Sequence, residues 1–525
     1  MPSYKNIPYA NTSFYLHSFI FYSKMLSSLY KNLGFRKYAI VLAYVAIAIG
    51  ITLRLIMFFQ DRDLIIDEAN IVRNLYERNF IELLYPLSYA QYAPPIFLWM
   101  EKTISLFSGF GSFSLKLFPM MCGIAMLFLF YAILTRLISI YIVWIPLSLL
   151  AVSPYFIEYS ATIKQYIFDS LISLLLIGLA LRTEIFATPS KRFFILWSSA
   201  GIIAIFSSMP SVFTLAAVGL YYGWIIFQSK EWKRLPYLFL ISGIWLLAFA
   251  LYYFTMLKPQ ITSGYLQSYH ADYFLSAFPT SYPEWKHDYM RLKELLNSAC
   301  GYSSYNYFIA YGCLAVAIIV LLKKKPAILL LLLTPVGLML VAAAANQYSL
   351  ILRLTLFALP LIVLLFGLGL NELWKIPSIF PKIAIIFVGV IMIKTANKFE
   401  LFREKHGFHE LTEGFHYLMS KGVKGEHLFV HSASDATFIY YTQIYPEKDQ
   451  YKSLANATIL PDSVDYATVT YGIKDTVYFI YTGGFPEVER RKRVQQIEQN
   501  MQQVDYFEKY ICFVYGYAPK AEANP

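Results

Sequence analysis

Long apolar runs separated by short polar breaks make up most of the chain before residue 397. A helix that crosses a bilayer needs about 20 mostly apolar residues. Eleven runs approach or reach this length, although the fifth and sixth are short and meet at Met209-Pro210. The pattern therefore predicts an all-α polytopic membrane domain over residues 38–396. Its predicted spans are 38–59, 114–134, 141–159, 162–181, 193–208, 210–228, 236–257, 304–322, 326–345, 349–370 and 378–396.

Basic residues alternate between the loops that join these spans. Lysine and arginine gather before the first span and in every second loop, as at 323–325, whereas the short loops around 160 and 347 nearly lack them. This is the positive-inside pattern of a multi-pass membrane protein. It predicts a plasma membrane location, such as a bacterial inner membrane, with segment 1–37 in the cytoplasm. Within that segment, residues 14–33 could form a helix lying on the membrane surface.

The chain changes character after residue 396. Charged residues mix there with short β-like runs at 427–432, 438–445 and 476–484, and a helical stretch follows at 487–503. This pattern predicts a small α/β domain over residues 397–525, which is within the usual size range of a domain. Eleven spans would place that domain outside the cytoplasm. The long loops 60–113 and 258–303 would lie on the same side.

The composition supports a membrane protein. The chain is 58% hydrophobic and 15% charged with a mean hydropathy of +0.50, whereas soluble domains average about 45–50% apolar and about 25% charged residues. Basic loops account for the net charge of +11, so we predict no nucleic-acid partner. Four scattered cysteines give no CxxC pair and predict neither a metal site nor a disulfide framework. A Cys300–Cys512 bridge stays open as an alternative.

Ionisable residues inside predicted spans are the first candidates for chemistry, because a charge at the centre of a span costs roughly 2.5–3.5 kcal/mol. Lys164 and Asp169 lie in the fourth span, five residues apart, which is a poor pairing distance on a helix. Each therefore needs a partner elsewhere or a wet cavity, although Lys164 could instead extend to the headgroups. Arg353 and Arg54 lie towards the outer ends of the tenth and first spans, and the same two interpretations apply to both.

Two adjacent acids, Asp67 and Glu68, follow the first span and open an amphipathic stretch. Taken alone, this spacing favours a helix that is capped by Asp67, with Glu68 in its first turn. The apolar residues Ile71, Leu75 and Leu83 would then lie on the membrane surface. If the nearby cations face inward instead, the acids lie at the mouth of a charged cavity.

Four motifs in this order resemble the GT-C superfamily of membrane glycosyltransferases, in the branch of protein O-mannosyltransferases and bacterial aminoarabinose transferases. They are the acidic pair after the first span, the double proline of YAPPIFLWM, the stretch SPYFIEYSATIKQY and the sequence RLTLFALP. The chain departs from the family pattern at two places. It has Ala93 where many relatives have His before the prolines, and residues 161–164 read ATIK where many relatives have Gln-Glu-Ala-Arg.

The resemblance implies transfer of a sugar from a polyprenyl-phosphate donor to a glycan, lipid or protein acceptor, on the non-cytoplasmic face and with inversion. It implies that Asp67 is the catalytic base and that Glu68 supports it. Lys164, Arg353 and Arg54 would bind the donor phosphate, so no cofactor is predicted, although a divalent cation stays open. The remaining cavity or substrate residues would be Tyr92, Pro94, Pro95, Glu158, Tyr159, Tyr166 and Asp169.

Two other functions remain open from the sequence. A transporter or flippase of lipid-linked saccharides would suit the hydropathy, but many transporters carry internal repeats, and neither a repeat nor an even number of spans is evident here. A non-catalytic membrane scaffold would use the tail to bind a partner. It would leave Lys164 and Asp169 unexplained at their predicted depth.

Overall fold

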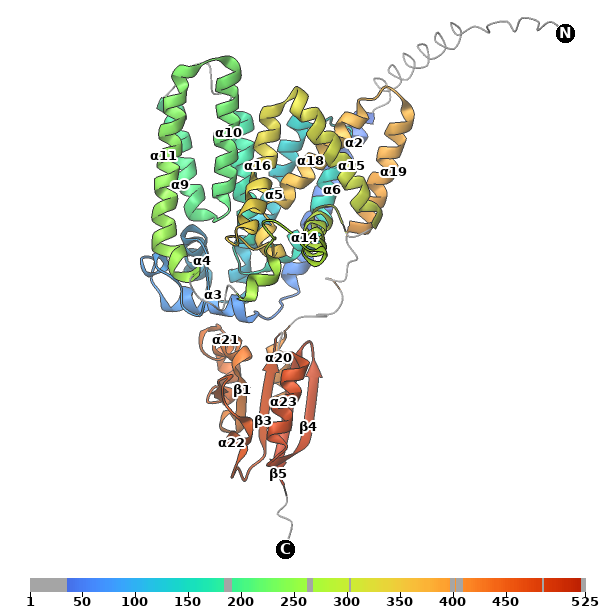
Figure 1. Cartoon of the computed structure of the whole chain (residues 1–525). Coiled ribbons are helices and arrows are strands. Elements are labelled where there is room, and N and C mark those ends of the chain that lie inside the picture. Colours follow the sequence, from blue (N-terminus) through green and yellow to red (C-terminus); the bar gives the residue numbers. More distant parts are fainter. Residues whose placement is uncertain are drawn as a thin grey trace, which may run out of the picture.

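The computed structural model describes residues 35–183, 191–261, 268–301, 304–396, 402, 409–483 and 486–520. The predicted surface helix at 14–33 lies outside these residues. A bundle of helices forms one part of the molecule, and a small domain built around a sheet lies against one end of the bundle (Figure 1). The helices α3 and α4 lie at the end that meets the small domain.

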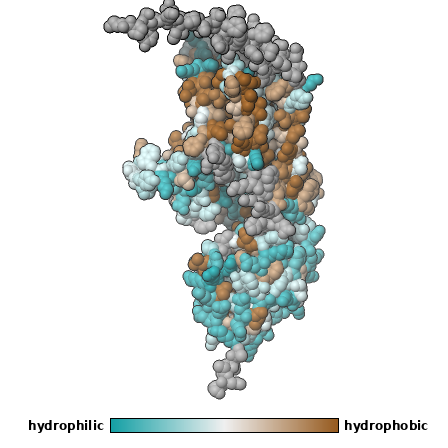
Figure 2. Space-filling view, turned by 90° about the vertical axis from the view of Figure 1, so that its right-hand side faces the viewer, coloured by the Kyte–Doolittle hydropathy of each residue, from teal (hydrophilic) through white to brown (hydrophobic). Residues whose placement is uncertain are grey.

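Each of the eleven predicted spans contains helix, although the third, fourth and tenth also include several nonhelical residues. Among the described residues, seven helices are long and apolar enough to cross a membrane, and a bent helix pair would make an eighth. On the face shown in Figure 2, apolar side chains gather over the middle of the bundle, whereas the small domain is mostly hydrophilic. The chain is therefore a multi-pass membrane protein. The bundle helices are α2 (Phe35–Phe59), α5 (Ser112–Leu137), α6 (Trp144–Val152), α8 (Tyr166–Arg182), α9 (Lys191–Ser207), α10 (Ser211–Ser229), α11 (Leu235–Tyr252), α15 (Ser304–Lys324), α16 (Pro326–Ala344), α18 (Leu359–Trp374) and α19 (Ile379–Ala396).

The bent pair lies at the junction of the third and fourth predicted spans. Helix α6 ends before Pro154, whose ring cannot continue a helix from the preceding turn, and α7 (Pro154–Glu158) and η2 (Tyr159–Ala161) follow. The chain then bends by 113° into α8. Residues 162–165 are not helical, so our prediction that Lys164 lies within the fourth helix is wrong. Lys164 instead lies in a buried turn that precedes the helix.

Helices α3 (Ile66–Glu77) and α4 (Pro95–Ser108) cover the end of the bundle next to the small domain. Pro95 is the first residue of α4, where its fixed φ suits a helix start. Ile71, Leu75 and Leu83 are 0% exposed, so they do not lie on the membrane surface as the amphipathic pattern predicted. They belong to the core of the protein, and α21 of the small domain packs against α3.

The small domain is α/β, as predicted. Its sheet has the order β2-β1-β3-β5-β4, in which β1 is parallel to β2 and β3, and β5 is antiparallel to β3 and β4. The sequence pattern did not predict β4 and β5. The strands are β1 (Leu428–His431), β2 (Thr458–Leu460), β3 (Val477–Thr482), β4 (Met501–Lys509) and β5 (Cys512–Pro519), and the main helices are α20 (Leu411–Ser420) and α23 (Glu487–Ile497).

Two further predictions for this region are wrong. The run 438–445, predicted as β-like from its aromatic residues, is helical, with α21 (Asp435–Ile439) followed by the turn Tyr440–Ile444. Two of its aromatic side chains bond to the bundle, since the Tyr440 hydroxyl donates to the carbonyl oxygen of Phe110 at 2.8 Å and the Tyr441 hydroxyl donates to Asp63 at 2.9 Å. The alternative of a Cys300–Cys512 bridge also fails, since both thiols are free and buried.

Asp63 anchors the small domain to the bundle. One carboxylate oxygen accepts a hydrogen bond from the backbone N–H of Thr412 at 2.8 Å, and the other accepts from the Thr412 hydroxyl at 3.0 Å and from the Tyr441 hydroxyl at 2.9 Å. Nearby, the hydroxyl of Thr437 donates to the carbonyl oxygen of Leu64 at 3.3 Å. The domain is therefore attached beside the start of α3.

Replacing Tyr441 with Phe should loosen this attachment. The change removes one buried hydrogen bond to a carboxylate, which contributes about 1.5–3 kcal/mol. We expect amides of α20 and α21 to exchange hydrogen for deuterium about tenfold faster or more, since 1.4 kcal/mol corresponds to a factor of ten. The matched control is Tyr506→Phe, which removes an exposed hydroxyl bonded to Glu508 within the domain. Equal exchange in both variants would contradict the anchoring role of Asp63.

Candidate active site

Glu68, and not Asp67, completes the start of α3. The helix begins at Ile66 with Ile65 as its N-cap residue, so our prediction that Asp67 is the cap is wrong. One oxygen of Glu68 reaches back to accept from the backbone N–H of Ile65 at 3.1 Å, as the third helical residue does in a capping box. The other oxygen accepts from the backbone N–H of Ile163 at 2.7 Å.

Glu68 is buried, with 5% of its surface exposed. Burial disfavours its charged form and raises its pKa above the ordinary value, although the Lys116 charge and the two backbone hydrogen bonds act in the opposite direction. The carboxyl group therefore acts as a fixed link between the start of α3 and the turn at 162–165.

Asp67 is part of a different set of contacts. Its carboxylate accepts a hydrogen bond from the Gln91 amide nitrogen at 3.3 Å and lies 3.8 Å from a guanidinium nitrogen of Arg353. Burial disfavours the charge on Asp67, but the nearby charges of Lys164 and Arg353 and the Gln91 hydrogen bond outweigh it and lower its pKa. Asp67 is therefore a carboxylate that stays charged in a partly buried site.

Two cations flank Asp67. Lys164 donates from its ammonium group to the Gln91 side-chain oxygen. Arg353, in the short helix α17 (Leu352–Thr355), donates to the Tyr269 hydroxyl at 3.2 Å and lies over the Tyr269 ring at 5.5 Å. The structure thus brings together the acid and both cations from three distant parts of the sequence.

These groups line one cavity of about 270 Å³. Seven residues predicted for the site contribute to its wall. They are Asp67, Glu68, Glu158, Tyr159, Lys164, Tyr166 and Arg353. The rings of Tyr159 and Tyr166 meet edge to face, with centroids 5.2 Å apart. The cavity wall therefore combines charged and aromatic side chains.

Arg54 does not line this cavity, contrary to our prediction. It is 0% exposed and donates to the carbonyl oxygens of Gly50 at 2.9 Å and Ala151 at 3.1 Å. Its guanidinium group therefore joins α2 to α6 inside the bundle. The alternative that Arg54 extends to the headgroups fails for the same reason.

Four other predicted cavity residues also lie outside the cavity wall. Tyr92 contacts the hydroxyl of Tyr252. Pro94 and Pro95 form the start of α4. Asp169 is buried in α8. These residues support the surroundings of the site rather than its surface.

The structure adds two cations that we did not predict, Lys116 and Arg62. Lys116 lies in the first turns of α5, and its ammonium group donates to the carbonyl oxygen of Arg62. Lys116 was detectable, because it lies inside the predicted span 114–134 and a charge there is costly. Gln91 was not detectable by that rule, since it carries no charge.

Cations and acids are balanced in the cavity wall. The cations are Arg62, Lys116, Lys164 and Arg353, and the acids are Asp63, Asp67, Glu68 and Glu158. Among the described parts of the chain, no three His, Cys, Asp or Glu side chains are grouped so that they could hold a metal ion. Basic side chains, rather than a cluster of metal ligands, surround Asp67.

Comparison with solved structures reveals the fold. Crystal structures of ArnT from Cupriavidus metallidurans match this chain with a TM-score of 0.52 in the undecaprenyl phosphate complex, at 12% identity, and in the apo state, at 11% identity. Each match covers 91% of this chain and 98% of ArnT. The Archaeoglobus fulgidus oligosaccharyltransferase, in complex with Zn and sulfate, matches at a TM-score of 0.50 and 12% identity over 91% of this chain and 73% of that chain.

No family model matches the chain, and no curated protein matches it by sequence. The structural matches cover most of the chain, and the matched proteins belong to the GT-C superfamily. The chain therefore has the GT-C fold that the four sequence motifs predicted, with ArnT and the archaeal oligosaccharyltransferase as structural neighbours.

Replacing Glu68 with Gln should destabilise the protein by about 1–3 kcal/mol, because one of the two buried backbone N–H groups loses its acceptor. The pKa of Glu68 is raised on folding, so its contribution to stability is present below its ordinary pKa and is lost as the pH rises through the raised value. The difference in melting temperature between wild type and variant should therefore narrow as the pH rises above 4.5. Thermal unfolding in detergent measures this difference, and a gap that widens with pH would contradict the assignment.

Proposed function

We propose that the chain is a membrane glycosyltransferase. It transfers one sugar from a polyprenyl-phosphate donor to a hydroxyl group of a glycan, lipid or protein acceptor, with inversion at the anomeric carbon. The observation that carries the proposal is a charged carboxylate, Asp67, in a cavity beside Lys164 and Arg353. A base next to fixed cations suits attack by a hydroxyl and departure of a phosphate.

Each group has a defined part in the proposed reaction. Asp67 takes the proton of the acceptor hydroxyl as its oxygen attacks the anomeric carbon. The bond between that carbon and the phosphate oxygen breaks, and the bonding electron pair leaves with the polyprenyl phosphate. Lys164 and Arg353 stabilise the negative charge that forms on the leaving phosphate, because charge-assisted hydrogen bonds are strong in a partly dry site.

The contacts of the two acids support Asp67 as the base. Each oxygen of Glu68 already accepts a backbone hydrogen bond, from Ile65 or from Ile163. Among the described residues, Asp67 accepts a hydrogen bond from the Gln91 side chain alone, and its pKa is lowered. Glu68 therefore positions Asp67 and the turn at 162–165, and Asp67 performs the proton transfer.

Two features of the surroundings complete the proposal. The positive charge of Lys164 and Arg353 takes the part that a divalent cation would play at the phosphate, so no metal is obligatory. The donor's lipid tail would stay in the bilayer, and the charge pattern of the loops supports a cavity on the non-cytoplasmic face of a plasma membrane. Segment 1–37 would be cytoplasmic and residues 38–396 would form the transferase domain. The extracytoplasmic domain 397–525 and the loop 258–303 would cover the cavity and help to select the acceptor.

The variant Asp67→Asn should lower transfer by at least about 100-fold while still inserting into membranes, because the amide cannot accept the proton. Product is measured in membranes supplied with polyprenyl-phosphate-linked sugars and candidate acceptors. The matched control is Asp61→Asn in the same loop. Asp61 is exposed and has a φ of 43°, a conformation that Asn tolerates well. Near-normal turnover of Asp67→Asn would remove Asp67 from the mechanism.

The variant Lys164→Met should act mainly on donor binding, since it removes one positive charge from the proposed phosphate site. We expect the Kd for undecaprenyl phosphate to rise by about tenfold or more, because a hydrogen bond to a charged group contributes about 1.5–3 kcal/mol. Lys286→Met, on the exposed part of α14 (Tyr282–Cys300), is the control. Unchanged affinity in Lys164→Met would count against the phosphate role.

A further inference from the structure

The turn that leads into α4 contains two residues in the left-handed conformation. Tyr89 has a φ of 64° and Ala90 a φ of 51°. Residues with a side chain rarely adopt this conformation, and two in succession persist only where surrounding contacts hold them. Strain of this kind is often found at functional sites. The contacts that hold this turn therefore indicate what the turn positions.

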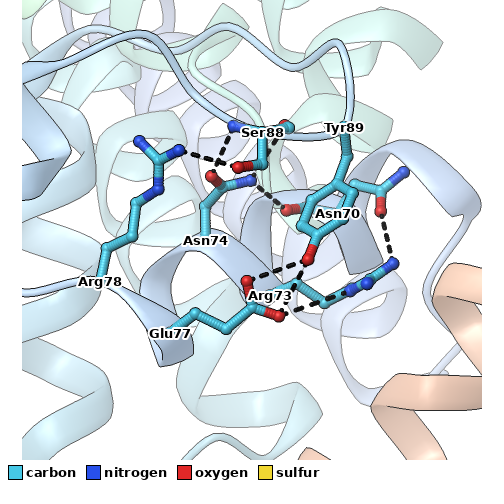
Figure 3. A network of polar contacts seen from close by, with 7 residues as sticks. All are labelled: Asn70, Arg73, Asn74, Glu77, Arg78, Ser88 and Tyr89. Carbon is cyan, nitrogen blue, oxygen red and sulfur yellow. Dashed lines mark hydrogen bonds and ion pairs between the residues drawn. The ribbon is translucent and has the colours of Figure 1, made fainter.

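Polar contacts hold the backbone before the turn (Figure 3). The Asn74 side chain donates to the carbonyl oxygen of Ser88 at 3.2 Å and accepts from the Ser88 backbone N–H at 2.9 Å. Arg78 donates to the Ser88 hydroxyl at 2.8 Å. Both the backbone and the side chain of Ser88 are thus fixed by residues of α3 and its end.

The Tyr89 ring is held from the same helix (Figure 3). The Arg73 guanidinium group lies 3.7 Å from the centre of the ring, and the Tyr89 hydroxyl donates to the two oxygens of Glu77 at 3.1 and 3.0 Å. Cation–π contact and hydrogen bonding therefore fix both the face and the tip of this side chain.

The held turn presents Gln91 to the cavity groups. The Gln91 amide nitrogen donates to the carbonyl oxygen of Tyr89 at 3.3 Å and to the carboxylate of Asp67 at 3.3 Å. Its amide oxygen accepts from the ammonium group of Lys164. The orientation of the amide follows from these partners, since two acceptors need the NH₂ group and an ammonium group needs the oxygen.

We propose that Gln91 is a positioning residue that keeps the Lys164 ammonium group from pairing directly with the Asp67 carboxylate. This inference rests on the proposed function. An amide suits the task because it donates to an anion and accepts from a cation while carrying no charge itself. Asp67 then remains able to take a proton, and Lys164 keeps donor hydrogens for a phosphate.

Two substitutions at Gln91 test the role. Gln91→Met keeps the volume but removes the hydrogen bonds to Asp67 and Lys164, and Gln91→Glu keeps the shape but adds a negative charge. In Gln91→Met, Lys164 becomes free to pair directly with Asp67, so the pKa of Asp67 should fall. In Gln91→Glu, the added negative charge disfavours charged Asp67, so the pKa of Asp67 should rise. The acid limb of kcat/KM should therefore move to lower pH in Gln91→Met and to higher pH in Gln91→Glu. We expect kcat to fall by about 10- to 100-fold, because misplaced reacting groups lose rate on that scale.

Gln347→Glu is the matched control for the added charge, since Gln347 is exposed in the loop before α17. Its acid limb should coincide with that of the wild type. A purely structural role for Gln91 would lower the rate equally at every pH. A limb that stays in place in both Gln91 variants would therefore overturn the proposal, even if the rate falls.

A third variant tests the turn itself. Asn74→Leu removes both contacts to the Ser88 backbone at similar volume, and it should move the acid limb in the same direction as Gln91→Met. Thermal unfolding checks that the variant is folded, and the Gln91 variants carry the test if it is not. An unmoved limb in a folded Asn74→Leu protein would show that the turn does not position Gln91.

Binding separates this proposal from the proposed function. Gln91→Glu should raise the Kd for undecaprenyl phosphate by about tenfold, because its new carboxylate pairs with Lys164 and competes with the phosphate. If the wild type transfers sugar but Gln91→Glu keeps the wild-type Kd and the wild-type acid limb, the role of Gln91 alone is overturned. Absence of any transfer by the wild type, with every acceptor class supplied, would overturn both.

Discussion

One hydrogen-bonded carboxyl group sets the geometry of the site. Glu68 accepts hydrogen bonds from Ile65 at the start of α3 and from Ile163, which is 95 positions away in the turn before α8. Asp67 immediately precedes Glu68, and Lys164 immediately follows Ile163. The positions of Asp67 and Lys164 therefore both depend on the two hydrogen bonds of Glu68. Because both of its oxygens accept backbone hydrogen bonds, Glu68 suits the role of a structural link better than the role of a base.

The link through Glu68 also explains how a broken helix is tolerated at this position. Backbone groups outside a helix are costly within a membrane protein unless protein or a wet cavity satisfies them. Pro154 ends α6, the chain bends by 113°, and the nonhelical residues 162–165 leave backbone groups that need partners. Glu68 supplies an acceptor for one of them. The break and the cavity therefore depend on each other, because the turn lines the cavity and a cavity acid completes the turn.

Much of the fold followed from the sequence, because a helix that crosses a bilayer must be long and apolar wherever it packs. Asp67 and Glu68 stood out as an acidic pair after the first span, and the cost of a charge inside a span located Lys164 and Arg353. The argument from charge failed for Arg54, whose partners are carbonyl oxygens of Gly50 and Ala151. The close approach of α2 and α6, at which a side chain on Gly50 would come within 3.0 Å of Ala151, is not visible in a hydropathy pattern. The argument from charge and hydropathy also missed Gln91. Its contacts depend on a turn that residues of α3 hold in the folded protein.

The segment between α2 and α3 has no regular structure, yet its positions are strongly determined. Lys116 donates to the carbonyl oxygen of Arg62, Asp63 holds the small domain, and Thr437 donates to the carbonyl oxygen of Leu64. Such dense pairing fixes a loop as firmly as a helix, because buried backbone groups that lose their partners are costly.

The pairing of this segment has a consequence for the proposed chemistry. Precise placement of a base accounts for a large part of catalytic rate, and it requires support from the surrounding contacts. The loop that carries Asp63 towards Asp67 is held by the bundle on one side and by the small domain on the other. The small domain therefore contributes to the site without supplying a cavity-lining residue of its own among the described parts of the chain. Its attachment through Asp63 is part of what keeps Asp67 in place.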